Sequence, residues 1–353
     1  MKDLNCDKAQ NSFDVWRIVM TLVIMCFHLV LGATFYTEYS YIHYHWYIAV
    51  EFFFILSGFL LAQHAENNRD ESAFQYTKKR VARLYPLYFV AFIVMCIIRS
   101  LNSGLNIFKI IIPNWPELIM CQSIGTNVFP YINNPAWYVS ALLIGGHVVY
   151  YLYKKHKSLY LEFVGPVSLI VIMSYMYRQY GRLENFYHTE GLFLNTALMR
   201  AFLGLTIGIY VFLISQKCKE HVLKISQAVI AAMEVLIFFG TLFFALIVEE
   251  GSYDFVFVFL FAIGILLSSL DTGLAKLSAC KVIKVLSELS YGMYLCHFAV
   301  LAYIGKIIDI GTKWHWWYVP IYIGITMVVA WIYHMAAKIL IKCVGRIYRS
   351  ISQ

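Results

Sequence analysis

Long apolar runs constrain this chain more than any other feature. Ten runs are long enough to cross a bilayer, and they lie at 13–33, 46–64, 84–101, 136–153, 160–177, 193–214, 225–247, 253–270, 288–308 and 317–341. A membrane-spanning helix needs about 20 such residues. Apolar residues make up 61% of the chain and charged residues only 14%, which excludes an ordinary soluble domain. The sequence therefore predicts an all-α fold, a polytopic bundle of about ten transmembrane helices.

The positions of the basic residues predict how this bundle is oriented. Lys and Arg gather at the N-terminus, in alternate connections at 69–83, 154–157, 217–224 and 276–284, and after residue 337. Clusters of this kind mark the cytoplasmic side of a membrane protein. We therefore expect both termini in the cytoplasm, and we interpret the net charge of +8 as a topology signal without a nucleic-acid partner. No repeat or soluble domain is visible, so residues 1–353 are expected to form a single transmembrane domain.

The first apolar run carries two ionisable residues, Arg17 and His28. Eleven residues make about three helical turns and rise ~16 Å, so both side chains lie on one helix face. Arg17 is then near one membrane surface and His28 near the middle, where ionisable groups are costly and usually functional. A neutral histidine at this depth can act as a base toward a hydroxyl. The alternative is a snorkelling arginine and a histidine that hydrogen-bonds a neighbouring helix.

Two further arginines occur in the stretch KKRVARLYPLY, at positions 80 and 83. Arg80 and Arg83 are three residues apart and share a helical face. Planar guanidinium donors suit phosphate oxygens, so the pair is a candidate cytoplasmic anion site. The alternative is ordinary positive charge on the cytoplasmic side.

An acid and an arginine lie in two different apolar runs. Glu51 occupies the outer part of its run, and a buried acid there needs a partner, either Arg200 or a histidine. Ser57 and Gly58 follow near the centre of the same run, where small residues permit close helix packing. Arg200 is expected to face the interior of the bundle.

A polar stripe runs along the apolar segment near the C-terminus. Ser290, Tyr294 and His297 fall at positions i, i+4 and i+7 of a helix. Inside a membrane such a stripe lines a water-filled cavity or forms a network between helices, and the sequence leaves both open.

No metal site is expected. His43 and His45 are close in sequence, but no third ligand accompanies them. The intramembrane residues His147, Glu234 and His334 are assigned structural roles.

These motifs together resemble acyltransferase family 3, a family of integral membrane acyltransferases, over nearly the whole chain. The resemblance is carried by Arg17-x10-His28, by Glu51-Phe52-Phe53 with Ser57-Gly58-Phe59, by Arg80-x-x-Arg83 with LYPLY, by Arg200 with Phe202 and Gly204, by Trp137 in PAWYVSALL, and by Ser290, Tyr291, Tyr294, Leu295 and His297. Two positions differ from many members of the family. Glu51 replaces an aspartate, and Leu142 replaces a glutamate five residues after the matching tryptophan.

The resemblance implies transfer of an acyl group, most often acetyl, from cytoplasmic acyl-CoA to a hydroxyl of an extracytoplasmic acceptor. It favours a cell-surface polysaccharide or glycan precursor as that acceptor, a multi-pass position in a bacterial cytoplasmic membrane, and no permanently bound cofactor. The sequence leaves a monomer and a homo-oligomer both open. The implied roles are catalysis for His28 and His297, donor binding for Arg17, Arg80 and Arg83, and acceptor binding or structural support for Glu51, Ser57, Trp137, Arg200, Ser290, Tyr291 and Tyr294.

Two other classes of function compete with an enzyme. The same scaffold could export a glycan or glycolipid, but an exporter is expected to show inverted repeats, and none is visible. It could also be a ligand-sensing membrane domain, although no output domain is attached. The paired Arg17 and His28 favour the enzyme.

Overall fold

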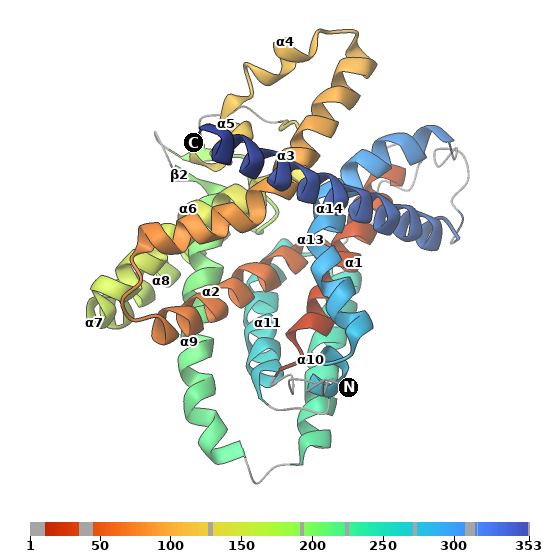
Figure 1. Cartoon of the computed structure of the whole chain (residues 1–353). Coiled ribbons are helices and arrows are strands. Elements are labelled where there is room, and N and C mark those ends of the chain that lie inside the picture. Colours follow the sequence, from red (N-terminus) through yellow and green to blue (C-terminus); the bar gives the residue numbers. More distant parts are fainter. Residues whose placement is uncertain are drawn as a thin grey trace, which may run out of the picture.

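The chain is described by a computed structural model that covers residues 11–34, 45–125, 130–190, 194–222, 226–270, 274–307, 315 and 317–351 (Figure 1). In the first half lie α1 Phe13–Thr34, η1 His45–Ile48, α2 Ala49–Asn67, α3 Ala73–Ser103, α4 Ile107–Ile111, α5 Trp115–Leu118, η2 Gln122–Ile124, η3 Asn134–Ala136, α6 Trp137–Lys155, α7 Lys157–Leu159, the π-helix η4 Tyr160–Val164 and α8 Gly165–Tyr180. In the second half lie β1 Thr189–Glu190, β2 Leu194–Asn195, α9 Thr196–Val222, α10 Gln227–Ile247, η5 Gly251–Tyr253, α11 Asp254–Ser269, α12 Ala275–Ser278, α13 Lys281–Ile307 and α14 Tyr318–Ile351.

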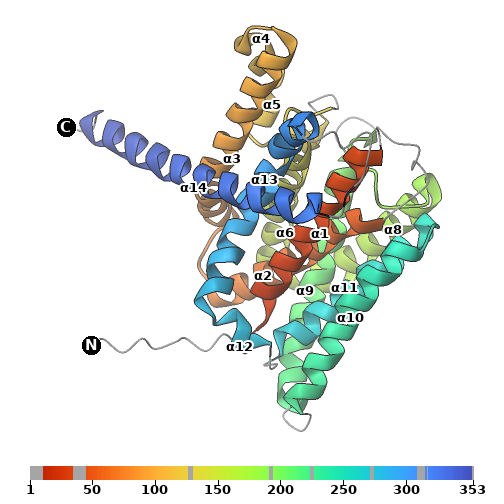
Figure 2. The ribbon, with the colours of Figure 1, turned by 90° about the vertical axis from the view of Figure 1, so that its right-hand side faces the viewer.

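The predicted all-α membrane bundle is confirmed. Within the described ranges, nine helical segments are long and apolar enough to cross a membrane. The short strands β1 and β2 pair antiparallel and are the exception to the helical fold. Figure 2 shows α10 with α11 on one side of the bundle and α14 with α13 on the other.

The predicted span at 136–153 corresponds to α6, which is not among these nine segments. Its apolar run is interrupted by His147 and by tyrosines, and it packs inside the bundle on α9, α3 and α2. At its C-terminal end, Lys154 donates to backbone carbonyls in the last turn of α2 and in the α2–α3 connection. At its N-terminal end, Trp137 stacks on Phe186, at the opposite end of the bundle. The helix therefore runs from one end of the bundle to the other although its composition is less apolar.

Helices α2 and α9 form the centre of the bundle. In their most apolar stretches 72% and 78% of the residues are buried, against 17% for the segment Lys157–Tyr180. Glycines allow the two backbones to approach closely. A Cβ atom on Gly208 would lie 2.0 Å from the carbonyl oxygen of Ile55, and one on Gly58 would lie 2.1 Å from that of Leu205. Small residues at a helix crossing permit this packing inside a membrane.

Helix α3 is longer than the apolar run that predicted it. Ser72 and Gln75 form a capping box, with the serine hydroxyl accepting from the Gln75 N–H at 3.2 Å. The helix ends at Gly104, whose φ of +69° suits a residue without a Cβ atom. The cap therefore starts the helix well before the apolar run and places Arg80 and Arg83 on regular helix.

Candidate active site

Three arginines from two helices gather at one end of the bundle. Arg17 lies on α1 and pairs with Asp14 at 3.0 Å, while Arg80 and Arg83 lie on α3. The charges of Arg17 and Arg80 both act on Arg83. Arg80 donates to the Tyr76 hydroxyl at 2.5 Å, and its buried Nε has no hydrogen-bond partner among the described residues. Gathered positive charge with an unused donor suits a polyanion such as a chain of phosphates.

Two histidines face each other between α1 and α13. The rings of His28 and His297 stack with their centres 5.2 Å apart, and Phe298 packs its edge against both. His297 is 0% exposed, and its Nδ1 lies 2.6 Å from the carbonyl oxygen of Tyr294. Because a carbonyl only accepts hydrogen bonds, Nδ1 carries the proton and Nε2 is left with a lone pair. Nε2 of His297 and Nδ1 of His28 are both buried and lack a hydrogen-bond partner within the described part of the chain.

The contact between α1 and α13 connects the two groups. Near the arginines, the Ser287 hydroxyl on α13 donates to Asp14 on α1 at 2.7 Å. Further along the same two helices, the histidine rings meet. Arg17 and His28 are separated by three turns of α1, about 16 Å. The structure therefore places a cluster of three arginines where α3 meets one end of this helix pair, and a pair of imidazoles about three turns further along α1.

Glu51 pairs with Arg200, which decides between the two partners that the sequence left open. The Nε–Oε1 distance is 2.6 Å, and the two side chains are 0% and 2% exposed. The guanidinium carbon lies 4.9 Å from the centre of the Trp137 ring, which stacks in turn on Phe186. Glu51, Trp137 and Arg200 thus form one buried cluster that ties α2, α6 and α9 together.

The predicted hydroxyl residues of α13 all bond to backbone carbonyls. Ser290 donates to Ser287 within its own helix, Tyr291 to Leu84 of α3 at 3.4 Å, and Tyr294 to Pro135 at 2.6 Å. Of the predicted stripe, Tyr294 joins α13 to a neighbouring segment, while Ser290 and His297 bond within the helix itself. Both roles that the sequence left open stay predictions.

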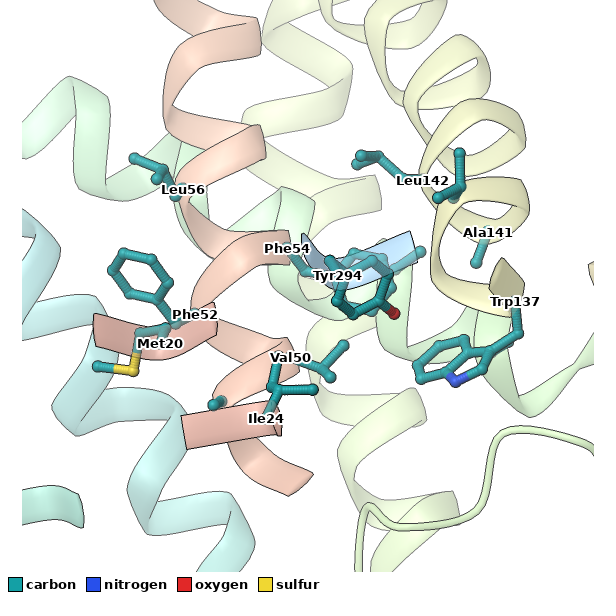
Figure 3. Packing of buried hydrophobic residues seen from close by; sticks show 14 of the residues in the cluster. Met20, Ile24, Val50, Phe52, Phe54, Leu56, Trp137, Ala141, Leu142 and Tyr294 are labelled. Carbon is teal, nitrogen blue, oxygen red and sulfur yellow. The ribbon is translucent and has the colours of Figure 1, made fainter. Parts of the chain in front are cut away.

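Two other predicted positions lie beside these helices. Ser57 of α2 hydrogen-bonds Tyr138, whose ring lies 5.8 Å from that of Tyr294. Leu142 is buried and packs in the apolar interior near Ala141 and Trp137 (Figure 3). An apolar environment of this kind suits the leucine.

Sequence reasoning missed a buried acid in the short helix α5. Glu117 is 0% exposed and accepts hydrogen bonds from the backbone N–H groups of Ile132 and Asn133, both at 2.7 Å. Burial raises its pKa to about 7, against the opposing effect of these two hydrogen bonds. A single acid between apolar residues in a proline-rich loop was the signal available, since its partners are backbone atoms.

Another buried cluster fastens one end of the bundle. Glu234 accepts hydrogen bonds from Ser12, from Trp16 at 2.6 Å and from Ser268 at 2.7 Å, which anchors the start of α1. This agrees with the structural role predicted for Glu234.

Of the two histidines considered as metal ligands, the structure describes His45. His45 pairs with Asp254 at 2.7 Å, and His43 lies outside the described residues. Over the ranges that the structure describes, no group of three or more His, Cys, Asp or Glu side chains is arranged for a metal ion.

Comparison with known proteins agrees with this arrangement. A family model described as an acyltransferase domain matches residues 10–336 of the chain. The chain belongs to acyltransferase family 3. The matched range includes every predicted site residue from Arg17 to His297, so the resemblance inferred from the sequence motifs is confirmed.

Among curated proteins, the acyltransferase MdmB of Streptomyces mycarofaciens is similar to this family member. The two are 31% identical over 105 residues, which are 26% of this chain and 24% of MdmB. The match thus spans about a quarter of the length of the relative. No solved structure matches the chain significantly.

Proposed function

We propose that this protein transfers an acetyl group from cytoplasmic acetyl-CoA to a hydroxyl of an extracytoplasmic glycan, either a cell-surface polysaccharide or its precursor. One observation carries the proposal: an arginine cluster on α1 and α3 and a pair of imidazoles on α1 and α13 lie about three turns of α1 apart. Membership of an acyltransferase family supports the reaction type. The nine apolar helices within the described ranges fit a multi-pass protein of a bacterial cytoplasmic membrane.

The arginine cluster would bind the phosphates of the donor. Coenzyme A is a polyanion at its nucleotide end and carries its thioester at the tip of a long, thin arm. With the phosphates held by Arg17, Arg80 and Arg83, the arm follows α1 toward His28. Positioning of this kind converts an encounter between two reactants into a reaction within one complex.

The histidines would then carry the proton. The hydroxyl oxygen of the glycan attacks the thioester carbonyl carbon. At the same time its proton passes to the ring nitrogen of neutral His28 that carries no hydrogen. The C–S bond breaks, and the imidazolium returns the proton to the departing thiolate sulfur. The neighbouring His297 accepts a hydrogen bond from another hydroxyl of the glycan through its Nε2 lone pair, which orients the sugar without a second proton transfer.

Acetyl-CoA hydrolysis and exchange by the purified protein test this proposal. His28→Ala is expected to lower turnover at least 100-fold with little change in donor binding, because it removes the base. Arg80→Ala is expected to raise the KM for acetyl-CoA about tenfold. His156→Ala and Arg178→Ala are matched controls, since both side chains are exposed away from the site.

The result that would sink the proposal is equally concrete. A folded wild-type protein that neither binds nor turns over acetyl-CoA or succinyl-CoA contradicts the proposal, and the exporter and sensor alternatives then move ahead. Full activity in the His28→Ala variant would reject the assigned base alone.

A further inference from the structure

The connection that precedes α6 is held rigidly against the helix that carries His297. Glu117 accepts from the backbone N–H groups of Ile132 and Asn133. The Tyr294 hydroxyl donates to the carbonyl of Pro135 at 2.6 Å. The segment 132–135 is therefore fixed at both of its ends, and it lies on the turn of α13 that leads to His297.

Asn133 lies in the middle of this segment and keeps one polar atom unused. The side chain is 1% exposed, and its amide nitrogen donates to the carbonyl of Leu295 at 3.0 Å. Because that carbonyl only accepts, the bonded atom must be Nδ2, and Oδ1 is the free one. Oδ1 of Asn133 and Oδ1 of Asn134 are both buried without a hydrogen-bond partner among the described residues.

The segment 132–135 and the turn of α13 that it contacts thus hold three buried polar atoms without partners among the described residues. They are Oδ1 of Asn133, Oδ1 of Asn134 and Nε2 of His297, which follows Leu295 by two residues. All three accept hydrogen bonds, and none can donate. Buried polar atoms without partners are rare in folded proteins, and each calls for an explanation.

We propose that Asn133 and Asn134 bind the hydroxyl groups of the acyl acceptor, a neutral polyhydroxy compound such as a sugar. A ligand rich in O–H donors satisfies three lone pairs at once. A phosphate or carboxylate would bring further lone pairs to the same place and be repelled. Asn133 and Asn134 are positioning residues here, and His297 accepts from a hydroxyl beside the reacting one. This inference rests on the proposed acetyl transfer and adds the side of the site that selects the acyl acceptor.

The experiment measures transfer of labelled acetyl from acetyl-CoA to methyl glycosides of glucose, galactose and rhamnose, each beside its deoxy analogues. We expect transfer to at least one glycoside. Asn134→Ala and Asn133→Ala should raise the KM for that sugar at least tenfold and leave the KM for acetyl-CoA unchanged. For the deoxy analogue that lacks the bound hydroxyl, wild type and variant should have the same sugar KM. That analogue offers no hydroxyl for the asparagine to bind, so removing the asparagine changes nothing.

Two controls separate binding from folding. Asn134→Ala removes no hydrogen bond seen in the structure, so its effect does not depend on a loosened fold. Asn106→Ala changes an asparagine whose oxygen already accepts from the Phe108 N–H, and it should leave both KM values unchanged.

Several outcomes would overturn the inference. Unchanged sugar KM in both variants removes the role of the asparagines. A parallel change in the KM for acetyl-CoA shows a general disturbance instead. Transfer to glycerol phosphate but to none of the neutral glycosides rejects the ligand class, as does hydrolysis of acetyl-CoA with transfer to no glycoside. A wild type that does not turn over acetyl-CoA at all counts against the proposed function. This result differs from the outcomes above, which reject only the role of the asparagines and the class of their ligand.

Discussion

A single charged pair inside the bundle depends on both of its residues. Glu51 and Arg200 are almost fully buried, so removing one leaves the other charged and unpaired in an apolar interior. Such a loss costs about 3–5 kcal/mol, although replacing both partners by apolar residues is often nearly neutral. We expect Arg200→Leu to lower the thermal unfolding midpoint in detergent strongly, and Glu51→Leu combined with Arg200→Leu to recover most of it.

The outer residue Arg182 provides the matched control for this pair. Its ion pair with Glu184 at 3.2 Å is exposed on both sides, so Arg182→Leu should cost no more than about 1 kcal/mol. Equal destabilisation by Arg182→Leu and Arg200→Leu would contradict the buried ion pair. A Glu51→Leu, Arg200→Leu double variant with a lower unfolding midpoint than Arg200→Leu alone would contradict it too.

The acid Glu117 makes stability depend on pH. Its pKa rises from 4.5 in the unfolded chain to about 7 in the fold, so folding favours the protonated form. The contribution of Glu117 to the free energy of unfolding is fully present below pH 4.5. It is lost as the pH rises to about 7, at about 1.4 kcal/mol per pH unit. Thermal unfolding of the wild type and Glu117→Gln between pH 4 and 8 should show this slope only in the wild type.

The Glu117→Gln variant carries two expectations of its own. It should be less stable than the wild type at acidic pH, because its amide group faces a backbone N–H donor. The exposed Glu184→Gln should retain the wild-type slope. Identical slopes in wild type and Glu117→Gln would remove Glu117 from the pH response.

Sequence reasoning identified the ionisable side chains of the site but only part of their partners. Helical spacing predicted that Arg17 and His28 share a face of α1, and a buried acid was expected to pair with Arg200 or a histidine. The stacking of His28 on His297 joins positions 269 residues apart in the chain, which no local pattern encodes. Glu117 and Asn133 were missed because they bond to backbone atoms, which leave no signature in residue type.

At the level of helices, the crossing of α2 and α9 depends on the absence of side-chain atoms. A Cβ atom on Gly208 would lie 2.0 Å from the carbonyl oxygen of Ile55, so Gly208→Ala must push the two helices apart. Overpacking of this kind typically costs about 1–3 kcal/mol. We expect a lower unfolding midpoint and, because α2 also carries Glu51, a loss of acetyl-CoA turnover.

Another helical glycine offers the matched control. Gly240 of α10 has no atom within 4 Å of an added Cβ atom, so Gly240→Ala should be neutral or stabilising by up to about 1 kcal/mol. If Gly208→Ala proved as stable as Gly240→Ala, the close approach of α2 and α9 would be wrong.

Hydropathy predicted which helices exist better than where they begin. The run at 84–101 became α3, Ala73–Ser103, because a capping box at Ser72 starts the helix in a polar stretch that hydropathy does not detect. The fourth run, 136–153, became α6, whose tyrosines and His147 make it less apolar than its neighbours while it lies inside the bundle. Local capping and burial by other helices thus decide what a window of composition leaves open.

At the scale of the whole molecule, polar contacts sort the helix ends into two surfaces. Lys157 pairs with Glu66 at 2.6 Å, which joins the start of α7, directly after α6, to the end of α2. Asp254 accepts from His45 and from the backbone N–H of Leu183, which joins other ends at the opposite surface. Because α6 runs between the two surfaces, we predict that it crosses the membrane in addition to the nine apolar segments within the described ranges. Ten crossings would put both termini on the same side, which we predict to be the cytoplasm. The single domain over 1–353 also stays a prediction.

Cysteine labelling tests this topology directly. In a background whose eight native cysteines are replaced by serine, Asp70→Cys, Lys155→Cys and Asn106→Cys each place one thiol at an exposed position. A membrane-impermeant maleimide should label Asn106→Cys in intact cells, and the other two only in inside-out vesicles, because Asp70 and Lys155 flank one surface and Asn106 the other. Retained acetyl-CoA turnover in the cysteine-free background controls for folding. Labelling of Asn106→Cys and Lys155→Cys from the same side would mean that α6 does not cross, and the two termini would then lie on opposite sides of the membrane.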